Sequence, residues 1–170
     1  TALRHGSNTL KGWTAPATVA YNGTTGLDTS ITVDAGGVPH VAYYDSANSS
    51  LKYARRAEGV WHATQVDMAN DVGSYPDIEV GADRTVHIAY YDATLGDLRY
   101  ARIKSGQIAT EAVDTSGVVG LDASLVLTPD GKVNITHYDT SGDDLELVRG
   151  NFGGWTNQTL DATEQQIAQG

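Results

Sequence analysis

The chain has 170 residues, of which 21 are acidic and 11 are basic, and its formal net charge is −10. This balance argues against nucleic acid as a partner, because that binding depends on Lys and Arg neutralising phosphates, and against an anionic membrane surface. The sequence has no cysteine, which excludes disulfides and thiolate metal sites. No apolar run approaches the roughly 20 residues that a membrane-spanning helix needs, so we expect no membrane insertion.

The dominant feature is an internal repeat with a spacing of 47 residues. It appears at three sets of equivalent positions: Ile31, Ile78 and Leu125; Tyr44, Tyr91 and Tyr138; Asp45, Asp92 and Asp139. A second half-motif recurs as Leu3-Arg4-His5, Leu51-Lys52-Tyr53, Leu98-Arg99-Tyr100 and Leu145-Glu146-Leu147. Ten residues after each of these leucines comes Trp13, Trp61, Ile108 or Trp155.

In chain order, the sequence begins with the outer half of one unit, with expected strands at 3–5 and 13–19. The first complete unit predicts strands at about 29–34, 38–45, 50–56 and 60–67, and the same four recur in each later unit. These runs are rich in Val, Ile, Tyr and Thr, which suit a pleated, half-buried surface. The turns Ala35-Gly36-Gly37 and Pro129-Asp130-Gly131 contain glycine, which permits positive φ.

Four short strands in a unit of this length are typical of a propeller blade. The sequence therefore predicts an all-β, β-propeller-type fold of three complete four-stranded antiparallel blades plus an N-terminal half blade. The expected boundaries, within a single domain over 1–170, are 1–21 for the half blade, about 26–68, 73–115 and 120–161 for the blades, and 162–170 for a C-terminal tail.

An open arc of blades exposes strand edges and has two different ends. Natural proteins cover such edges, and contact between unlike ends is head to tail. We therefore expect the chain to associate with itself into an oligomer or filament, in which a neighbouring chain or its segment 162–170 covers the edge at 3–7. The alternative is that the chain is part of a longer propeller, whose further strands cover the same edge within one chain.

The repeat reads Ser-Ile-x-Val-Asp, Gly-x-Pro-His-Val-Ala-Tyr-Tyr-Asp, Leu-Lys-Tyr-Ala and Gly-x-Trp. It resembles repeats of large secreted bacterial and archaeal proteins with sialidase-like propellers, and this resemblance implies an extracellular or cell-surface location. Sialidases grip a carboxylate with arginines on their inner strands. The expected inner strands here contain no arginine, and the family's Asp-box survives only as Gly-x-Trp or Gly-Trp. These departures argue against sialidase activity.

The most prominent polar residues end the second strand of each blade: Tyr44, Asp45, Tyr91, Asp92, Tyr138 and Asp139. They are candidate ligand-binding residues of a lectin-like, glycan-binding propeller, because Tyr offers both a stacking surface and a hydroxyl. The structural interpretation is that each Asp caps the following turn. The sequence favours this second reading, since a feature repeated in every blade solves the same folding problem. By the same logic, His40 and His87 favour hydrogen bonds at blade interfaces over a metal site.

No activated nucleophile and no metal-binding motif is recognisable, so we expect no catalytic residue, no metal site and no cofactor. The acidic loops 92–97 and 139–144 leave calcium as an alternative to solvated turns. The main functional prediction is thus a non-catalytic extracellular module with a structural, self-assembling role. A glycan-binding propeller is the alternative, and a glycosidase or lyase is less favoured.

Three Asn-x-Ser/Thr triplets, at Asn22, Asn48 and Asn157, lie on expected loops or on an outer strand and are candidate N-glycosylation sites. The tryptophans Trp13, Trp61 and Trp155 open the fourth strands and are expected to pack against a neighbouring third strand rather than hold a ligand.

Overall fold

The computed structural model describes residues 4–5, 8–9, 12–13, 17–20 and 25–161, and every regular element in this part of the chain is a β-strand. The strands form three four-stranded antiparallel sheets in which each strand pairs with the next along the chain. The first blade contains β5 (Thr25–Val33), β6 (Pro39–Asp45), β7 (Ser50–Ala57) and β8 (Val60–Asp67). The second contains β9 (Val72–Val80), β10 (Val86–Asp92), β11 (Asp97–Lys104) and β12 (Gln107–Asp114), and the third β13 (Val119–Leu127), β14 (Val133–Asp139), β15 (Asp144–Asn151) and β16 (Gly154–Asp161).

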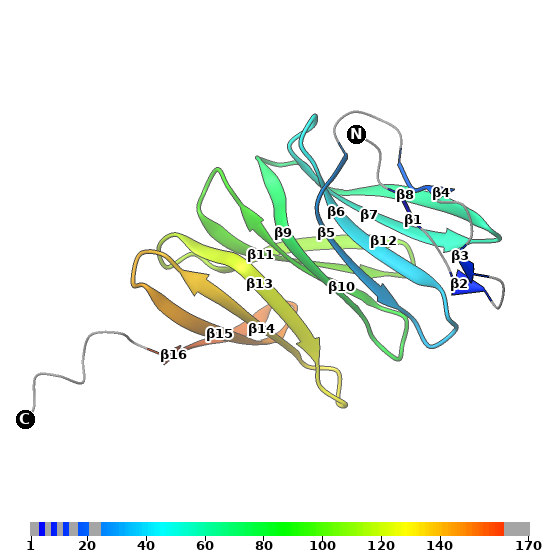
Figure 1. The fold of residues 1–170 in the computed structure, drawn as a ribbon. Coiled ribbons are helices and arrows are strands. Elements are labelled where there is room, and N and C mark those ends of the chain that lie inside the picture. Colours follow the sequence, from blue (N-terminus) through cyan, green and yellow to red (C-terminus); the bar gives the residue numbers. More distant parts are fainter. Residues whose placement is uncertain (1–3, 6–7, 10–11, 14–16, 21–24, 162–170) are drawn as a thin grey trace, which may run out of the picture.

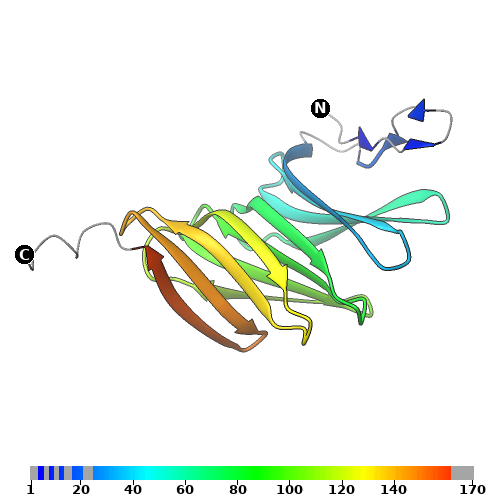
Figure 2. The same ribbon diagram turned by 60° about the horizontal axis from the view of Figure 1, so that its bottom comes forward.

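The three sheets follow one another as blades (Figure 1). The first strand of each later blade lies across the preceding blade: β9 contacts β5, β6 and β7, and β13 contacts β9, β10 and β11. Figure 2 shows the blades fanned in sequence order. The predicted all-β fold of three complete blades is confirmed. Within the described residues, no helix of membrane-crossing length and apolarity is found.

The N-terminal fragment contains four short strands, β1 (Arg4–His5), β2 (Asn8–Thr9), β3 (Gly12–Trp13) and β4 (Ala17–Thr18). β1 pairs with β4 and β2 pairs with β3, which is the nested order of a single hairpin. This fragment corresponds to the predicted half blade. The tail 162–170, Asn22 and most of the edge at 3–7 lie outside the described residues, so the predicted covering of that edge stays a prediction.

The innermost strand of each blade begins earlier than the sequence indicates. β5 begins at Thr25 rather than near residue 29, and it contains two residues with positive φ, Gly26 at 95° and Asp28 at 44°. The pairing of β5 with β6 shifts register at both places, which marks a bulged strand. Glycine and aspartate are typical turn residues, so the sequence alone suggests a turn at Gly26 and Asp28, but both residues belong to β5. The same pattern recurs at Gly73 and Tyr75, and at Gly120 and Asp122.

Glycine is required in this bulge because two blades touch there. A Cβ on Gly73 would lie 2.6 Å from the Cα of Leu51 in the preceding blade, and one on Gly120 would lie 2.7 Å from the Cα of Leu98. Leu51 and Leu98 are both fully buried by this approach. The equivalent residue of the third blade, Leu145, is 46% exposed.

The hydrophobic core lies mainly between adjacent blades rather than within one sheet. One cluster joins Leu51 and Tyr53 of the first blade to Ile78, Ile88 and Tyr90 of the second. A second cluster joins the second and third blades around Tyr100. Trp155 is part of that junction, as its ring meets the Tyr100 ring at 4.9 Å edge-on and its Nε1 donates to Glu111 at 2.8 Å. Trp61 packs on a third cluster, and the side chain of Trp13 lies outside the described part of the structure.

The close contact between Gly73 and the Leu51 backbone predicts that one added methyl group at residue 73 lowers stability. Gly73→Ala introduces a Cβ against the Leu51 backbone at a φ of +109°, whereas Gly59→Ala at a φ of +80° meets no atom within 4 Å. We expect Gly73→Ala to lower the free energy of unfolding by about 2 kcal/mol more than Gly59→Ala, because only the former adds overpacking to backbone strain. Urea unfolding of both variants measures the difference. Equal losses would contradict the proposed role of the contact.

Candidate binding clefts between the blades

Two clefts lie at equivalent places between successive blades. The first, between the first and second blades, has a volume of about 980 Å³, and the second, between the second and third, about 710 Å³. Both values fall within the range of about 300–1,000 Å³ that is usual for ligand sites. Each is lined by a His, a Tyr and an Arg at matching positions of the repeat: His40, Tyr53 and Arg55 in the first, and His87, Tyr100 and Arg102 in the second.

A buried His–Tyr pair forms the floor of each cleft. The distance from His40 Nδ1 to the Tyr53 hydroxyl is 2.6 Å, and from His87 Nδ1 to the Tyr100 hydroxyl 2.7 Å. Burial lowers the pKa of both histidines, which keeps them neutral, and it raises the pKa of Tyr53 to about 12. In the first cleft, His40 Nε2 faces the Asp34 carboxylate at 3.4 Å, which favours the proton on Nε2 and a Tyr53 hydroxyl that donates to Nδ1.

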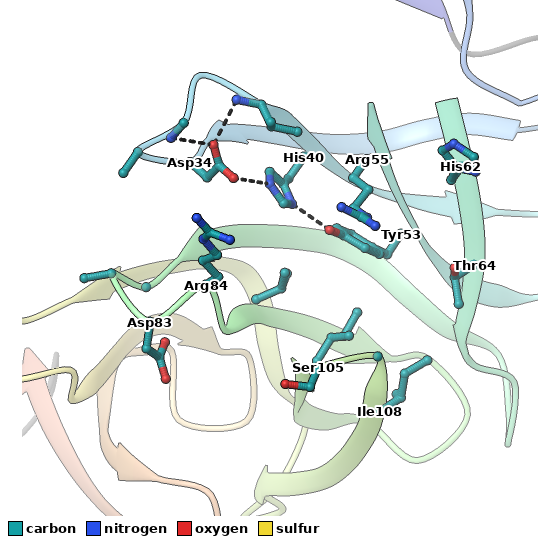
Figure 3. A pocket seen from close by; sticks show the side chains of 18 residues that line it. Asp34, His40, Tyr53, Arg55, His62, Thr64, Asp83, Arg84, Ser105 and Ile108 are labelled. Carbon is teal, nitrogen blue, oxygen red and sulfur yellow. Dashed lines mark hydrogen bonds and ion pairs between the residues drawn. The ribbon is translucent and has the colours of Figure 1, made fainter. Parts of the chain in front are cut away.

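The walls of the first cleft come from different blades. His40 lies on β6 and Tyr53 and Arg55 on β7, while Arg84 and Ser105 belong to turns of the second blade on the opposite side (Figure 3). In the second cleft, the Arg102 guanidinium lies over the Phe152 ring of the third blade, 4.7 Å from its centroid.

The acidic residues of the first cleft are already engaged. Asp34 accepts hydrogen bonds from the backbone nitrogens of Gly36 and Val38, at 2.8 and 2.9 Å, and faces His40 Nε2 at 3.4 Å. The bond from Val38 is the main cause that lowers the pKa of Asp34. Lys104, at 2.9 Å, is the main cause that lowers the pKa of Asp83. A general acid needs a raised pKa, so neither carboxyl group is suited to protonate a leaving group at neutral pH.

The third blade lacks the His–Tyr pair. Asn134 and Leu147 take the equivalent positions, and Arg149 Nε donates to Asn134 Oδ1 at 2.8 Å. The sequence showed the histidine positions but not the clefts. The one indication of the clefts in the sequence is that His40, Tyr53 and Arg55 all recur together 47 residues later.

The predicted ligand residues lie elsewhere. His40 is near the start of β6, whereas Tyr44 and Asp45 are at its end, and none of the six predicted residues lines either cleft. Asp45 is buried and accepts from Ala47 N at 3.2 Å and Asn48 Nδ2 at 2.8 Å. Asp92 accepts from Thr94 N, and Asp139 from Ser141 N. All three cap turns, which is the structural interpretation, and ligand binding at these residues stays a prediction.

The tyrosines beside these aspartates also have protein partners. The Tyr44 hydroxyl donates to Asp71, and that of Tyr138 to Asp143, both at 2.6 Å. The Tyr91 ring lies 6.4 Å from that of Tyr75. These contacts connect loops of the same or adjacent blades, so they have a use that needs no ligand.

Two of the candidate glycosylation sites are described. Asn48 is exposed in a turn, and its Nδ2, the atom that a glycan would join, donates to Asp45. Asn157 Nδ2 donates to Glu146 at 3.0 Å and also to Asp114. Glycosylation at Asn22, Asn48 and Asn157 stays a prediction.

One side-chain cluster, outside both clefts, has the composition of a metal site. Asp114, His137 and Glu146 are buried, and their ligand atoms lie within 4.8 Å of one another. However, His137 Nδ1 accepts a hydrogen bond from Gly120 N at 3.2 Å, so Nε2 holds the proton, 3.5 Å from Asp114. In this arrangement His137 offers no lone pair to a metal ion.

The equivalent positions of the second blade hold a different cluster. There, Tyr90 donates to Asp67 at 2.7 Å, and Arg99 pairs with Asp67 at 3.2 Å and with Asp92 at 3.7 Å. The third blade has His137 in place of the tyrosine and Glu146 in place of the arginine. The third blade thus has an acid where the second has a partly buried cation. Burial, with smaller contributions from Asp114 and Asp139, raises the pKa of Glu146.

Comparison with known proteins shows the fold. No protein-family model and no curated protein matches the chain. A lectin from Aleuria aurantia, solved with Fucα1-6GlcNAc, is similar with a TM-score of 0.65 and 14% identity over 94% of this chain and 53% of the lectin. A Dyadobacter fermentans protein of unknown function has a TM-score of 0.63 at 14% identity over 86% of this chain and 54% of its own.

An α-L-arabinofuranosidase from Fusarium graminearum is also similar, with a TM-score of 0.59 and 12% identity over 79% of this chain and 48% of the enzyme. The chain thus spans about half the length of these three proteins. At these identities the similarity shows the fold alone, and the chain is a β-propeller-type protein of three complete blades and a fragment.

The Glu146 environment predicts a pH dependence. A raised folded-state pKa contributes stability that is fully present below the ordinary value of 4.5 and is lost as the pH rises through the folded value. Gln at this position cannot ionise and can still donate a hydrogen bond to Asp114. We therefore expect the melting temperature of Glu146→Gln minus that of the wild type to increase as the pH rises from about 4.5 to about 8.

Burial lowers the pKa of His137, so its contribution is present above the ordinary 6.5 and lost as the pH falls. Because His137 is common to both proteins, its effect largely cancels in the difference between them. Thermal unfolding followed by circular dichroism across this pH range provides the measurement. A difference in melting temperature that does not change with pH would show that folding does not raise the pKa of Glu146.

Proposed function

We propose that the chain is a non-catalytic, glycan-binding propeller module that binds saccharides in the clefts between its blades. The observation that carries this proposal is the recurrence of one polar set, a neutral His held by a Tyr beside an Arg, in two equivalent clefts of ligand size. This conclusion follows the alternative functional prediction more closely than the structural, self-assembling one.

The chemistry of the clefts suits a saccharide. A sugar presents hydroxyl groups that both donate and accept hydrogen bonds, and apolar ring faces between them. An arginine supplies several N–H donors in a fixed plane, whereas the lining His and Tyr rings are more than nine-tenths buried and expose little of their surface to the cleft. The His–Tyr hydrogen bond fixes two of these side chains before any ligand arrives, which reduces the conformational entropy lost on binding.

The similar structures support saccharides as the ligand class. The Aleuria aurantia lectin was solved with a fucose-containing disaccharide, and the Fusarium graminearum protein is a glycosidase. Between these two, the lowered pKa values of Asp34 and Asp83 favour binding over cleavage in the first cleft. Two clefts in one chain would also allow two branches or neighbouring units of a glycan to be bound together, with a gain in avidity.

Self-association remains part of the proposal, with a second copy of the chain as the partner. It is favoured by Leu145, which is 46% exposed although the equivalent Leu51 and Leu98 are fully covered by the next blade. A surface built to receive an inner strand is the kind of apolar patch that a second chain covers.

The clefts can be tested separately by alanine substitution. We expect Arg55→Ala and Arg102→Ala each to weaken saccharide binding in their own cleft by about ten- to a hundredfold, the equivalent of one or two hydrogen bonds from a charged donor. Arg56→Ala is the matched control, because Arg56 donates to the Gly59 carbonyl and lines neither cleft. A glycan array identifies the saccharide, and calorimetry measures affinity and stoichiometry.

Two outcomes of this experiment would count against the proposal. If no glycan on the array binds the wild-type chain, the clefts are not saccharide sites. Release of reducing sugar from a bound glycan would show that the module is an enzyme.

Light scattering tests self-association. We expect the wild-type chain at micromolar concentration to exceed the 18.0 kDa mass of a monomer and Leu145→Ser to shift towards it, because a polar residue disrupts an apolar contact. Leu160→Ser is the control, since Leu160 is also 46% exposed but is not at the blade-contact position. A wild-type chain that stays monomeric would refute this part of the proposal.

A further inference from the structure

The turn between β9 and β10 has an arginine, Arg84, where the equivalent turns of the other two blades have a glycine. The three equivalent turns each place one residue in the left-handed region, with φ of 78° at Gly37, 64° at Arg84 and 80° at Gly131. Glycine adopts this conformation freely, whereas an L residue with a side chain adopts it at an energetic cost. The second blade therefore keeps an arginine where glycine satisfies the backbone better, which points to a use for its side chain.

That side chain belongs to the first cleft, where Arg55 faces it from the other blade (Figure 3). Neither guanidinium makes a hydrogen bond or ion pair within the described part of the chain. The other basic side chains described there are engaged: Lys52 with Asp45, Arg56 with the Gly59 carbonyl, Arg99 with Asp67, Arg102 with the Phe152 ring, Lys104 with Asp83, Lys132 with Asp130, and Arg149 with Asn134.

Among the described residues that line the first cleft, no acid is free to neutralise the two arginines. Asp34 is bonded to two backbone nitrogens and His40, and Asp83 to Thr85 and Lys104. Two unpaired guanidinium groups across one cleft, in a chain with a net charge of −10, form a local site for an anion. A guanidinium matches the paired oxygens of a carboxylate or a sulfate with two parallel N–H donors.

We infer that the first cleft selects saccharides that carry an anionic group, a carboxylate or a sulfate, which Arg55 and Arg84 hold between the first and second blades. This inference rests on the proposed function and names its substrate class. The second cleft has Gly131 in place of Arg84, and its Arg102 is stacked on Phe152, so it takes neutral saccharides. One chain thus combines an acidic-sugar site with a neutral-sugar site.

The decisive variant is Arg84→Gly, which installs the residue of the other two blades. We expect it to unfold at the same or a higher temperature, because backbone strain is relieved, and to bind acidic glycans about ten- to a hundredfold more weakly. Arg84→Lys keeps the charge without the planar fork and should retain an intermediate affinity. Arg56→Ala, outside the cleft, should bind as the wild type does.

The probes are array glycans with one common core that is neutral, carboxylated or sulfated, followed by calorimetry of the best member of each class. We expect wild-type binding of the acidic members to weaken when salt is raised, while binding of the neutral core stays constant. Preference for only the carboxylated or only the sulfated member identifies which anion the cleft accepts.

The outcomes separate this inference from the proposed function. If the neutral and acidic members bind equally, or if Arg84→Gly leaves acidic binding unchanged, the inference is overturned while glycan binding stands. If no member of any class binds, the proposed function itself fails.

Discussion

The structure depends on one steric constraint, the close approach of each innermost strand to the blade before it. At Gly73 and Gly120 the backbone lies so near a leucine of the preceding blade that any Cβ would collide with main-chain atoms. The bulge with positive φ allows this approach and seals Leu51 and Leu98 from solvent. Because the blades touch tightly at the beginning of β9 and β13, the space between them remains near the other end of these strands. The clefts lie there, lined by the turns that follow β5, β9 and β13.

Within this repeated frame, individual blades differ by substitution at equivalent positions. The second blade uses a Tyr–Arg–Asp cluster at a site where the third blade has His137 and Glu146. The first two blades have His–Tyr pairs, and the third replaces the pair with Asn134 and Leu147. Positions that stay the same, such as the turn-capping aspartates, serve the fold. The exceptions change charge and hydrogen-bonding capacity without altering the backbone, so they are where blade-specific properties arise.

Arg84 illustrates how function is read from such an exception. A repeat protein has its own internal controls, because each position occurs several times in nearly the same backbone. Gly37 and Gly131 show which residue the turn geometry favours, and Arg84 departs from it in a turn that lines the first cleft opposite Arg55. The unpaired guanidinium groups of Arg84 and Arg55 supply a chemical reason for that departure. Lys104, which lies nearby, is already paired with Asp83.

The sequence by itself determined the four strands of each complete blade, their meander order and the turn-capping role of Asp45, Asp92 and Asp139, because periodicity and turn chemistry act between residues close in the chain. It placed the start of the innermost strands too late, since Gly26 and Asp28 resemble a turn unless the neighbouring blade is present. It singled out Tyr44 and Asp45 at the end of β6, whereas the first cleft is lined by His40 near the start of that strand. Only the tertiary structure decided that His40 and Arg55 of one blade would face Arg84 of the next. Their separation in space is set by the way the two sheets pack against each other, and no local pattern of residues encodes that packing.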